Sequence, residues 1–259
     1  MLPKLPGSVS QLCIYTGNIL SLNEIKKKAG QDATEELLSS LKIIVNNWKI
    51  PENMSDSCIS IKNSDESLNN VTDVAPTELK TSVKVFIAKG KKEELQNAID
   101  NLFSSLGAVS VDSLVLAYMN HSSMSNDELL KDILELWKIL ERNVENKKLD
   151  RIGISDVDTD LFIDLYKSAK IKPSIVQINL QSCCVVPPAL QEFTKANEVQ
   201  LLTHNDPLDI LPGQALSEIF DSNNKRKEVR LNWVSRYQVH VICRGVLAIK
   251  GYIVSIDLN

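Results

Sequence analysis

Long hydrophobic runs are missing from this 259-residue sequence. No stretch approaches the roughly 20 apolar residues that a membrane-spanning helix requires. The first residues, Met-Leu-Pro-Lys-Leu-Pro-Gly, also lack the apolar run of a signal peptide. The five cysteines, an odd number in a long chain, do not make a disulfide framework, so a reducing compartment is the default. The sequence therefore predicts a cytoplasmic protein that does not enter a membrane.

Several kinds of binding motif are missing as well. No glycine-rich loop precedes a helix, so the sequence has neither a Rossmann fingerprint nor a Walker phosphate loop. The three histidines have no second His or Cys at the spacing of metal ligands, and we expect structural or exposed histidines and no metal site. A net charge of -4 gives no electrostatic reason to expect nucleic acid or an anionic membrane as a partner.

What the sequence does contain is organised around residues 151–207, where three short apolar strands each end in polar residues. Ser155 and Asp156 follow the first strand, residues 181–184 the second, and residues 204–206 the third. Helical spacers of roughly 20 residues separate the strands, which is the βα repeat of a parallel sheet. We therefore expect these polar groups to gather at one edge of the sheet, where a (β/α) barrel carries its site.

Further βα pairs precede this region. Residues 83–88 predict a strand, and the helix that follows it is stopped by Gly107. Residues 112–118 form a nearly continuous apolar run, as in a parallel sheet covered on both faces. Ser125 is placed to cap the long helix that comes next.

Towards the end of the sequence, residues 229–237 predict a helix and residues 239–256 contain broken strand segments. The total of about eight strands fits one closed barrel, which typically needs about 250 residues. We therefore predict an α/β fold with residues 1–259 as a single domain, a (β/α)8 TIM barrel. Residues 53–81 are rich in Ser, Asn and Asp, contain one short candidate strand at residues 58–61, and predict a flexible insertion.

Two adjacent cysteines, Cys183 and Cys184, stand at the end of the second strand. Cysteine is a compact apolar residue, so both could simply be buried there. Neighbouring residues of a strand point to opposite faces, however, so one thiol could reach the surface and pair with another chain. The residues alone leave these two interpretations open.

The polar strand ends also resemble a known family. Residues 152–156, the strand that contains Gln177 behind Pro173, and residues 203–207 are similar to the aldo-keto reductase superfamily, whose motifs there read IGVSNF, kPxxxQ and tAYSP. The superfamily fold is the (β/α)8 barrel. Residues 233–245 look like its last helix and strand.

The resemblance has consequences for catalysis. Reductases of that family use a tyrosine as proton donor, supported by lysine, aspartate and histidine. Lys89 fits the lysine position, but Tyr118 falls where the histidine is expected, and no Asp-Thr-Ala followed by Tyr-Gly occurs between the first two strands. A positioned proton donor is typically worth about 10²- to 10⁴-fold in rate. We therefore expect a catalytically silent barrel with a residual pocket of Lys89, Tyr118 and His204.

The resemblance implies that some of the residues that contact NADP(H) in the family are retained in this sequence. Residues that hold the nicotinamide amide in the family match Ser155, Asp156 in place of Asn, and Gln177, while an asparagine replaces the stacking tyrosine. Two cations fall where the family places basic residues around the 2′-phosphate; the alternative is that they are solvated cations beside turn glycines. No cofactor is required in this interpretation, and a non-catalytic NADP(H) would contact Ser155, Asp156, Gln177, Asn205, Arg244 and Lys250.

A narrower resemblance covers both ends and the middle of the chain. The chain looks like the regulatory (modifier) subunits of glutamate–cysteine ligase at residues 177–188 and 200–207, and also near its two ends, at residues 16–18, 244–245 and 250–252. This implies a non-catalytic partner of the ligase catalytic subunit that improves glutamate use and weakens glutathione inhibition. It also implies a heterodimer with an intersubunit disulfide, for which Cys183, Cys184 and Cys243 are the candidates. The alternative function is an NADP(H)-dependent reductase with a displaced proton donor such as Tyr118 or Tyr15.

Overall fold

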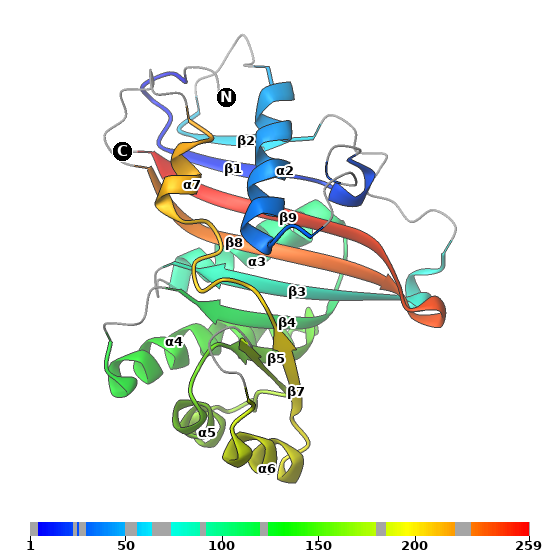
Figure 1. Cartoon of the computed structure of the whole chain (residues 1–259), viewed down its shortest axis with the longest axis vertical. Coiled ribbons are helices and arrows are strands. Elements are labelled where there is room, and N and C mark those ends of the chain that lie inside the picture. The colour runs from blue at the N-terminus through cyan, green and yellow to red at the C-terminus, as the bar shows by residue number, and fades with distance from the viewer. Residues whose placement is uncertain are drawn as a thin grey trace. The chain divides into compact units, whose positions relative to one another are not determined.

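The computed structural model describes residues 5–22, 25, 30–49, 56–63, 74–88, 92–119, 124–179, 185–220 and 229–258. The protein has an α/β fold that divides into two units (Figure 1). Unit 1 comprises Met1–Lys80 and Asp209–Asn259, and unit 2 comprises Thr81–Leu208. The single domain expected over residues 1–259 stays a prediction. Among the described residues, no helix is long and apolar enough to cross a membrane.

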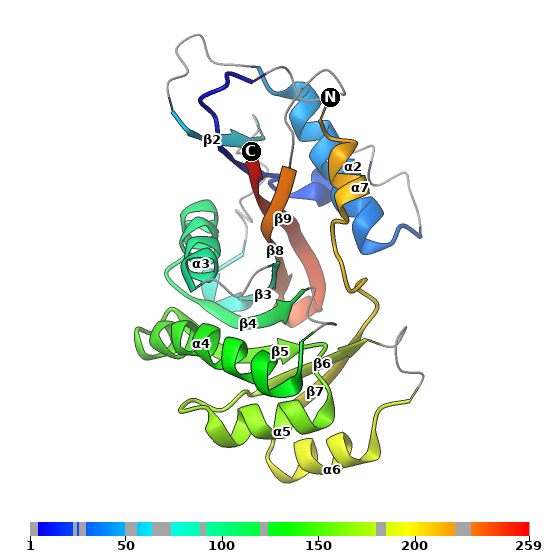
Figure 2. The same cartoon turned by 90° about the vertical axis from the view of Figure 1, so that its left-hand side faces the viewer.

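Unit 2 is a series of βα pairs with parallel strands in the order β3-β4-β5-β6-β7. Figure 2 shows α4, α5 and α6 along one face of β4 to β7. This parallel sheet is consistent with the TIM barrel that the sequence predicts. Its elements are β3 (Leu79–Ile87), α3 (Lys92–Leu106), β4 (Val111–Tyr118), α4 (Asn126–Glu145), β5 (Leu149–Ser155), α5 (Thr159–Ser168), β6 (Ile175–Asn179), α6 (Pro188–Ala196) and β7 (Gln200–His204).

Local sequence explains why these elements begin where they do. The Ser125 side chain accepts a hydrogen bond from the backbone of Glu128, whose side chain in turn accepts one from the Ser125 backbone, so the predicted cap of α4 is confirmed. The apolar stripe of α4 is buried and includes Leu136 and Trp137. Between β5 and β6, Gly153 pairs with Ile175, and a Cβ atom on Gly153 would lie 2.6 Å from the Ile175 Cβ. The absence of a side chain there allows the two strands to pair.

Unit 1 has a mixed sheet with the strand order β2-β1-β9-β8. β1 and β2 are parallel, whereas β9 runs antiparallel to both β1 and β8. Its elements are β1 (Gln11–Tyr15), η1 (Ile19–Ser21), α2 (Ala33–Asn47), β2 (Cys58–Lys62), η3 (Pro76–Glu78), α7 (Gly213–Ser217), β8 (Val229–Val241), η4 (Ile242–Arg244) and β9 (Val246–Leu258).

Two expectations for unit 1 have different outcomes. The short strand predicted at residues 58–61 is confirmed as β2, but residues 53–55 and 64–73 of the predicted insertion lie outside the described residues. The helix predicted over residues 229–237, and with it the family's last helix, is wrong because this segment belongs to β8. Val229, Leu231, Trp233 and Tyr237 are two or four residues apart, which is a multiple of the two-residue period of a strand.

Candidate functional site

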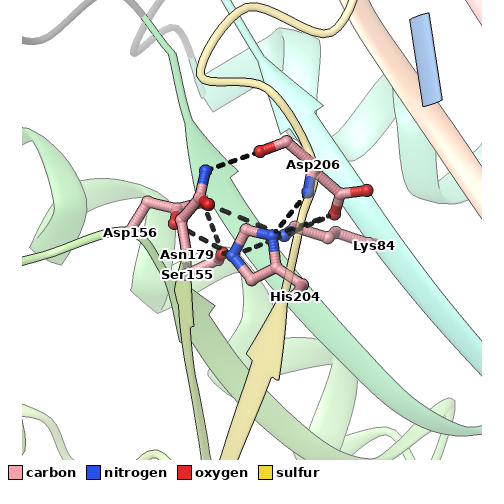
Figure 3. A network of polar contacts seen from close by, with 6 residues as sticks. All are labelled: Lys84, Ser155, Asp156, Asn179, His204 and Asp206. Carbon is pink, nitrogen blue, oxygen red and sulfur yellow. Dashed lines mark hydrogen bonds and ion pairs between the residues drawn. The ribbon is translucent and has the colours of Figure 1, made fainter. Parts of the chain in front are cut away.

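Polar side chains from four strands of unit 2 meet at the carboxyl ends of those strands (Figure 3). They come from β3, from the end of β5, from the end of β6, and from β7 with the residues after it. The expected gathering of polar groups is therefore confirmed for Ser155 and Asp156 with His204 and Asp206, whereas residues 181–184 lie outside the described residues. We call this group the strand-end cluster; it consists of Lys84, Ser155, Asp156, Asn179, His204 and Asp206.

His204 is hydrogen-bonded through both ring nitrogens. Its Nε2 lies 2.9 Å from Asp156 Oδ1, and its Nδ1 accepts a hydrogen bond of 3.1 Å from the backbone N–H of Asp206. Because Nδ1 accepts, we assign the ring proton to Nε2, which donates it to Asp156. The Ser155 hydroxyl donates to Asp156 Oδ2 over 2.6 Å. Both carboxylate oxygens of Asp156 thus have donors within the cluster.

Lys84 and Asn179 are the members of the cluster that the sequence did not predict. The side chain of Lys84 is 4% exposed, and its Nζ lies 3.0 Å from Asp206 Oδ2 and 3.9 Å from Asp156 Oδ2. Asn179 Nδ2 holds the same loop by donating to the backbone oxygen of Asp206 over 2.6 Å. The available signal was a single cation inside the apolar run of residues 83–87, because a charge is rarely buried without a partner.

The ion pair between Lys84 and Asp206 also reports the curvature of the sheet. β4, β5 and β6 lie between β3 and β7, so a flat sheet would hold β3 and β7 about 19 Å apart. Side chains of a lysine and an aspartate do not bridge that distance. The sheet of unit 2 must therefore curl, as the strands of a barrel do.

Asp156 combines an unusual backbone conformation with a shifted pKa. Its φ of 62° lies in the left-handed region, which aspartate tolerates better than most residues, and its N–H donates to the Gln177 backbone oxygen over 3.0 Å. Burial opposes ionisation of this carboxyl. The hydrogen bond from His204, the charge of Lys84 and the hydrogen bond from Ser155 outweigh that effect and lower the pKa of Asp156.

The order Ser155, His204, Asp206 has the residue types of a nucleophilic triad, with 3.1 Å between Ser155 Oγ and His204 Nε2. The geometry does not activate the serine, however. Its hydroxyl proton is given to Asp156, and His204 Nδ1 accepts an N–H where a triad histidine would donate to an aspartate. Ser155 is also only 1% exposed. What the cluster does chemically is neutralise buried charge and join strand ends.

The other residues of the predicted pocket are placed differently. The Tyr118 hydroxyl donates to Asp132 Oδ2 of α4 over 3.1 Å. Gln177 lies in β6, and its buried side-chain Oε1 has no hydrogen-bond partner among the described residues. Asn205 is exposed. Lys89, the expected catalytic lysine, lies outside the described residues.

Residues expected at the 2′-phosphate and in disulfides belong to unit 1 or are not described. Arg244 is exposed in η4, as expected of a solvated cation. Lys250 instead forms an ion pair of 2.6 Å with Glu36 of α2 and is 19% exposed, so the alternative of a solvated cation is wrong for this residue. Cys243 is a free, exposed thiol in η4. Cys183 and Cys184 lie outside the described residues.

The residues present do not fit a nicotinamide amide, which needs a donor for its oxygen and acceptors for its NH2 group. The Ser155 hydroxyl is already donated to Asp156, and a carboxylate at position 156 cannot donate as the family's asparagine can. Asn205 supplies no aromatic ring for stacking. Gln177 Oε1 is the one acceptor of this set that the described residues leave unpartnered. Within the described residues, no group of three or more His, Cys, Asp or Glu side chains could hold a metal ion.

Comparison with known proteins gives consistent results. The model of the Aldo/keto reductase family matches residues 53–239. The glutamate–cysteine ligase regulatory subunit of Rattus norvegicus is 33% identical over 253 residues, covering 94% of this chain and 92% of that protein. The corresponding subunit of Homo sapiens is 32% identical, covering 93% of this chain and 91% of that protein.

One solved structure, the aldose reductase of Giardia lamblia, is 16% identical with a TM-score of 0.40, covering 66% of this chain and 52% of that chain. The family model spans more than half of the sequence, and the curated relatives match it over nearly their whole length. The chain therefore belongs to the aldo/keto reductase family and, within it, to the glutamate–cysteine ligase regulatory subunits.

Proposed function

We propose that this protein is the non-catalytic regulatory subunit of a glutamate–cysteine ligase. It binds the catalytic subunit as a heterodimer in the cytoplasm, improves the use of glutamate and weakens inhibition by glutathione. The observation that carries this proposal is the 33% identity that extends over 94% of this chain and 92% of the rat regulatory subunit. The match therefore extends over nearly all of both sequences and is not limited to a shared fragment.

Activation by binding has a defined physical basis. A subunit raises the activity of its partner only if it binds the active conformation more tightly than the inactive one. The required preference is small, since about 1.4 kcal/mol changes an equilibrium tenfold. No cofactor is needed for this effect.

The absence of catalysis by the chain itself is part of the proposal. The two tyrosines considered as displaced proton donors are poorly suited to that role. Tyr118 gives its hydroxyl proton to Asp132, and burial raises the pKa of Tyr15, which makes it a weaker acid. The reductase alternative therefore gains no support from these residues.

A disulfide to the catalytic subunit is the redox part of the proposal. The exposed thiol of Cys243 in η4 is accessible for such a bond, and Cys183 and Cys184 remain candidates from the sequence. A covalent tether raises the effective concentration of the partner without any new non-covalent contact. Mass spectrometry of the oxidised complex should find one of these three cysteines cross-linked.

The decisive experiment combines this chain with the catalytic subunit. We expect the two to co-purify, and we expect the KM for glutamate to fall and the inhibition constant for glutathione to rise, each by up to about tenfold. The catalytic subunit alone is the reference, and Cys243→Ser in oxidising and reducing buffer is the matched control for the disulfide. Failure to co-purify, together with unchanged kinetics, would refute the proposed function.

A further inference from the structure

We propose that the side chains of the strand-end cluster bond to one another instead of to a ligand, so that this chain does not bind the nicotinamide end of NADP(H). We call this closed set of contacts the clasp. The inference concerns the chain's own side chains and is independent of the partner subunit. It also assigns the cluster a role, which is to fasten strands of unit 2 across the concave side of a curled sheet.

The hydrogen-bonding capacity of the clasp is used internally. Asp156 accepts from His204 and from Ser155, and His204 accepts from the Asp206 backbone. Asp206 in turn receives the Lys84 ammonium on its side chain and Asn179 on its backbone oxygen. An amide ligand would find the serine hydroxyl and both Asp156 oxygens already engaged. To receive the single hydroxyl proton of Ser155, the amide oxygen of a ligand would have to break the hydrogen bond of Ser155 to Asp156.

Burial makes such an exchange unfavourable. Three members of the clasp are almost fully buried: Lys84 and Asn179 are each 4% exposed, and Asp206 is 5% exposed. Charged groups at this depth need their partners, because water is not available to solvate a separated lysine or aspartate. A ligand that displaced Asp156 would leave Lys84 with Asp206 as its single counter-ion. The clasp is therefore stable as it is and resists opening.

The clasp connects strands that are not hydrogen-bonded neighbours in the sheet. The Lys84 to Asp206 pair joins β3 to the residues after β7, 122 positions apart in sequence. The Asp156 to His204 contact joins the ends of β5 and β7, which have β6 between them. Such cross-links hold the curl of the sheet without any cofactor, so no bound nucleotide is needed to order this edge.

A binding experiment tests the ligand half of the inference. Isothermal titration calorimetry compares NADPH with 2′,5′-ADP, which has the adenosine 2′-phosphate but no nicotinamide. We expect either no binding of both ligands or affinities within about threefold of one another, because the nicotinamide contributes nothing. NADPH binding at least tenfold tighter than 2′,5′-ADP, with the advantage lost in Gln177→Ala, would overturn the inference.

A double-mutant cycle tests the clasp itself. In urea unfolding we expect Lys84→Met and Asp206→Asn to be strongly non-additive, with a coupling of at least tenfold in the unfolding equilibrium constant. The matched control is an exposed ion pair, Lys42 and Glu218, whose charged atoms lie 2.6 Å apart. We expect Lys42→Met and Glu218→Gln to couple by less than threefold in the unfolding equilibrium constant.

A coupling between Lys84→Met and Asp206→Asn that is no larger than the coupling in the control pair would refute the clasp. If Lys84→Met does not fold, the same cycle with Asp156→Asn and His204→Gln replaces it. These substitutions remove charge and the ring while keeping hydrogen-bonding groups, and the expected coupling is again at least tenfold.

Discussion

At the scale of single residues, Asp156 shows how one side chain can satisfy backbone and electrostatic demands together. Its left-handed φ of 62° is a conformation that aspartate adopts more readily than most residues other than glycine. Its negative charge balances that of Lys84, and its Oδ1 accepts a hydrogen bond from His204 Nε2. Asparagine would satisfy the backbone but not the charge, so Asp156→Asn separates the two roles.

The lowered pKa of Asp156 gives a pH-dependent prediction. A folded-state pKa below the ordinary value of 3.8 means that the carboxylate stabilises the fold above that value and that this stability is lost as the pH falls through the folded pKa. We expect Asp156→Asn to cost about 1–3 kcal/mol at neutral pH. Below about pH 5 the mutant should lose less further stability than the wild type in urea unfolding.

The control for this measurement is Asp164→Asn, whose carboxyl is 55% exposed and pairs with a solvent-exposed lysine. It should follow the wild-type pH dependence, because exposed ion pairs contribute little. Equal acid dependence for wild type and Asp156→Asn would show that the charge of Asp156 does not stabilise the folded state.

At the scale of elements, the close approach of β5 and β6 depends on Gly153. A methyl group there would meet the Ile175 Cβ and backbone oxygen at 2.6 Å, and backbone cannot move aside as a flexible side chain can. Both strands end in members of the strand-end cluster, Ser155 and Asn179. The spacing of these two strands therefore sets the geometry of the site.

We expect Gly153→Ala to destabilise the protein by about 1–3 kcal/mol, because overpacking between paired strands forces them apart. Thermal or urea unfolding measures the effect. Gly213→Ala at the start of α7 is the matched control, since a Cβ there meets nothing within 4 Å, and it should be neutral or slightly stabilising. A Gly153→Ala protein as stable as the control would contradict the tight pairing of β5 and β6.

The elements also show what sequence reasoning could and could not predict. The βα units of unit 2 could be predicted because their sequences contain local signals, such as the Ser125 cap and the apolar run of β4. The first part of β8 resembles a helix in sequence because Trp233, Val234 and Tyr237 also have the spacing of one helix face. The pairing of β8 with β9 was also missed, because the turn through η4 ends in Gly245 and resembles a simple strand break.

At the scale of the whole molecule, the strand-end cluster was only half predictable. Ser155, Asp156 and His204 could be placed together because parallel strands bring their carboxyl ends to one edge. Lys84 could not, since it lies 120 positions from His204 and reaches it only because the sheet curls. Curvature is a property of the assembled strands, and no local pattern encodes it.

The proposed lack of reductase activity is tested on the complete protein. With NADPH and an aromatic aldehyde, we expect no loss of NADPH absorbance beyond that in buffer, because neither Tyr118 nor Tyr15 is suited to donate a proton. Tyr118→Phe should behave like the wild type. Turnover that disappears in Tyr118→Phe would favour the reductase alternative, whatever the outcome of the experiment with the catalytic subunit.

The antiparallel pairing of β1 with β9 has a consequence for how the protein is made. Gln11 pairs with Asp257, so the sheet of unit 1 needs strands from both ends of the sequence, whereas unit 2 is one continuous segment. A ribosome releases all of unit 2 before it has synthesised β9. Until then one edge of β1 has no partner from this chain, and the growing chain must protect that edge from pairing with other nascent proteins.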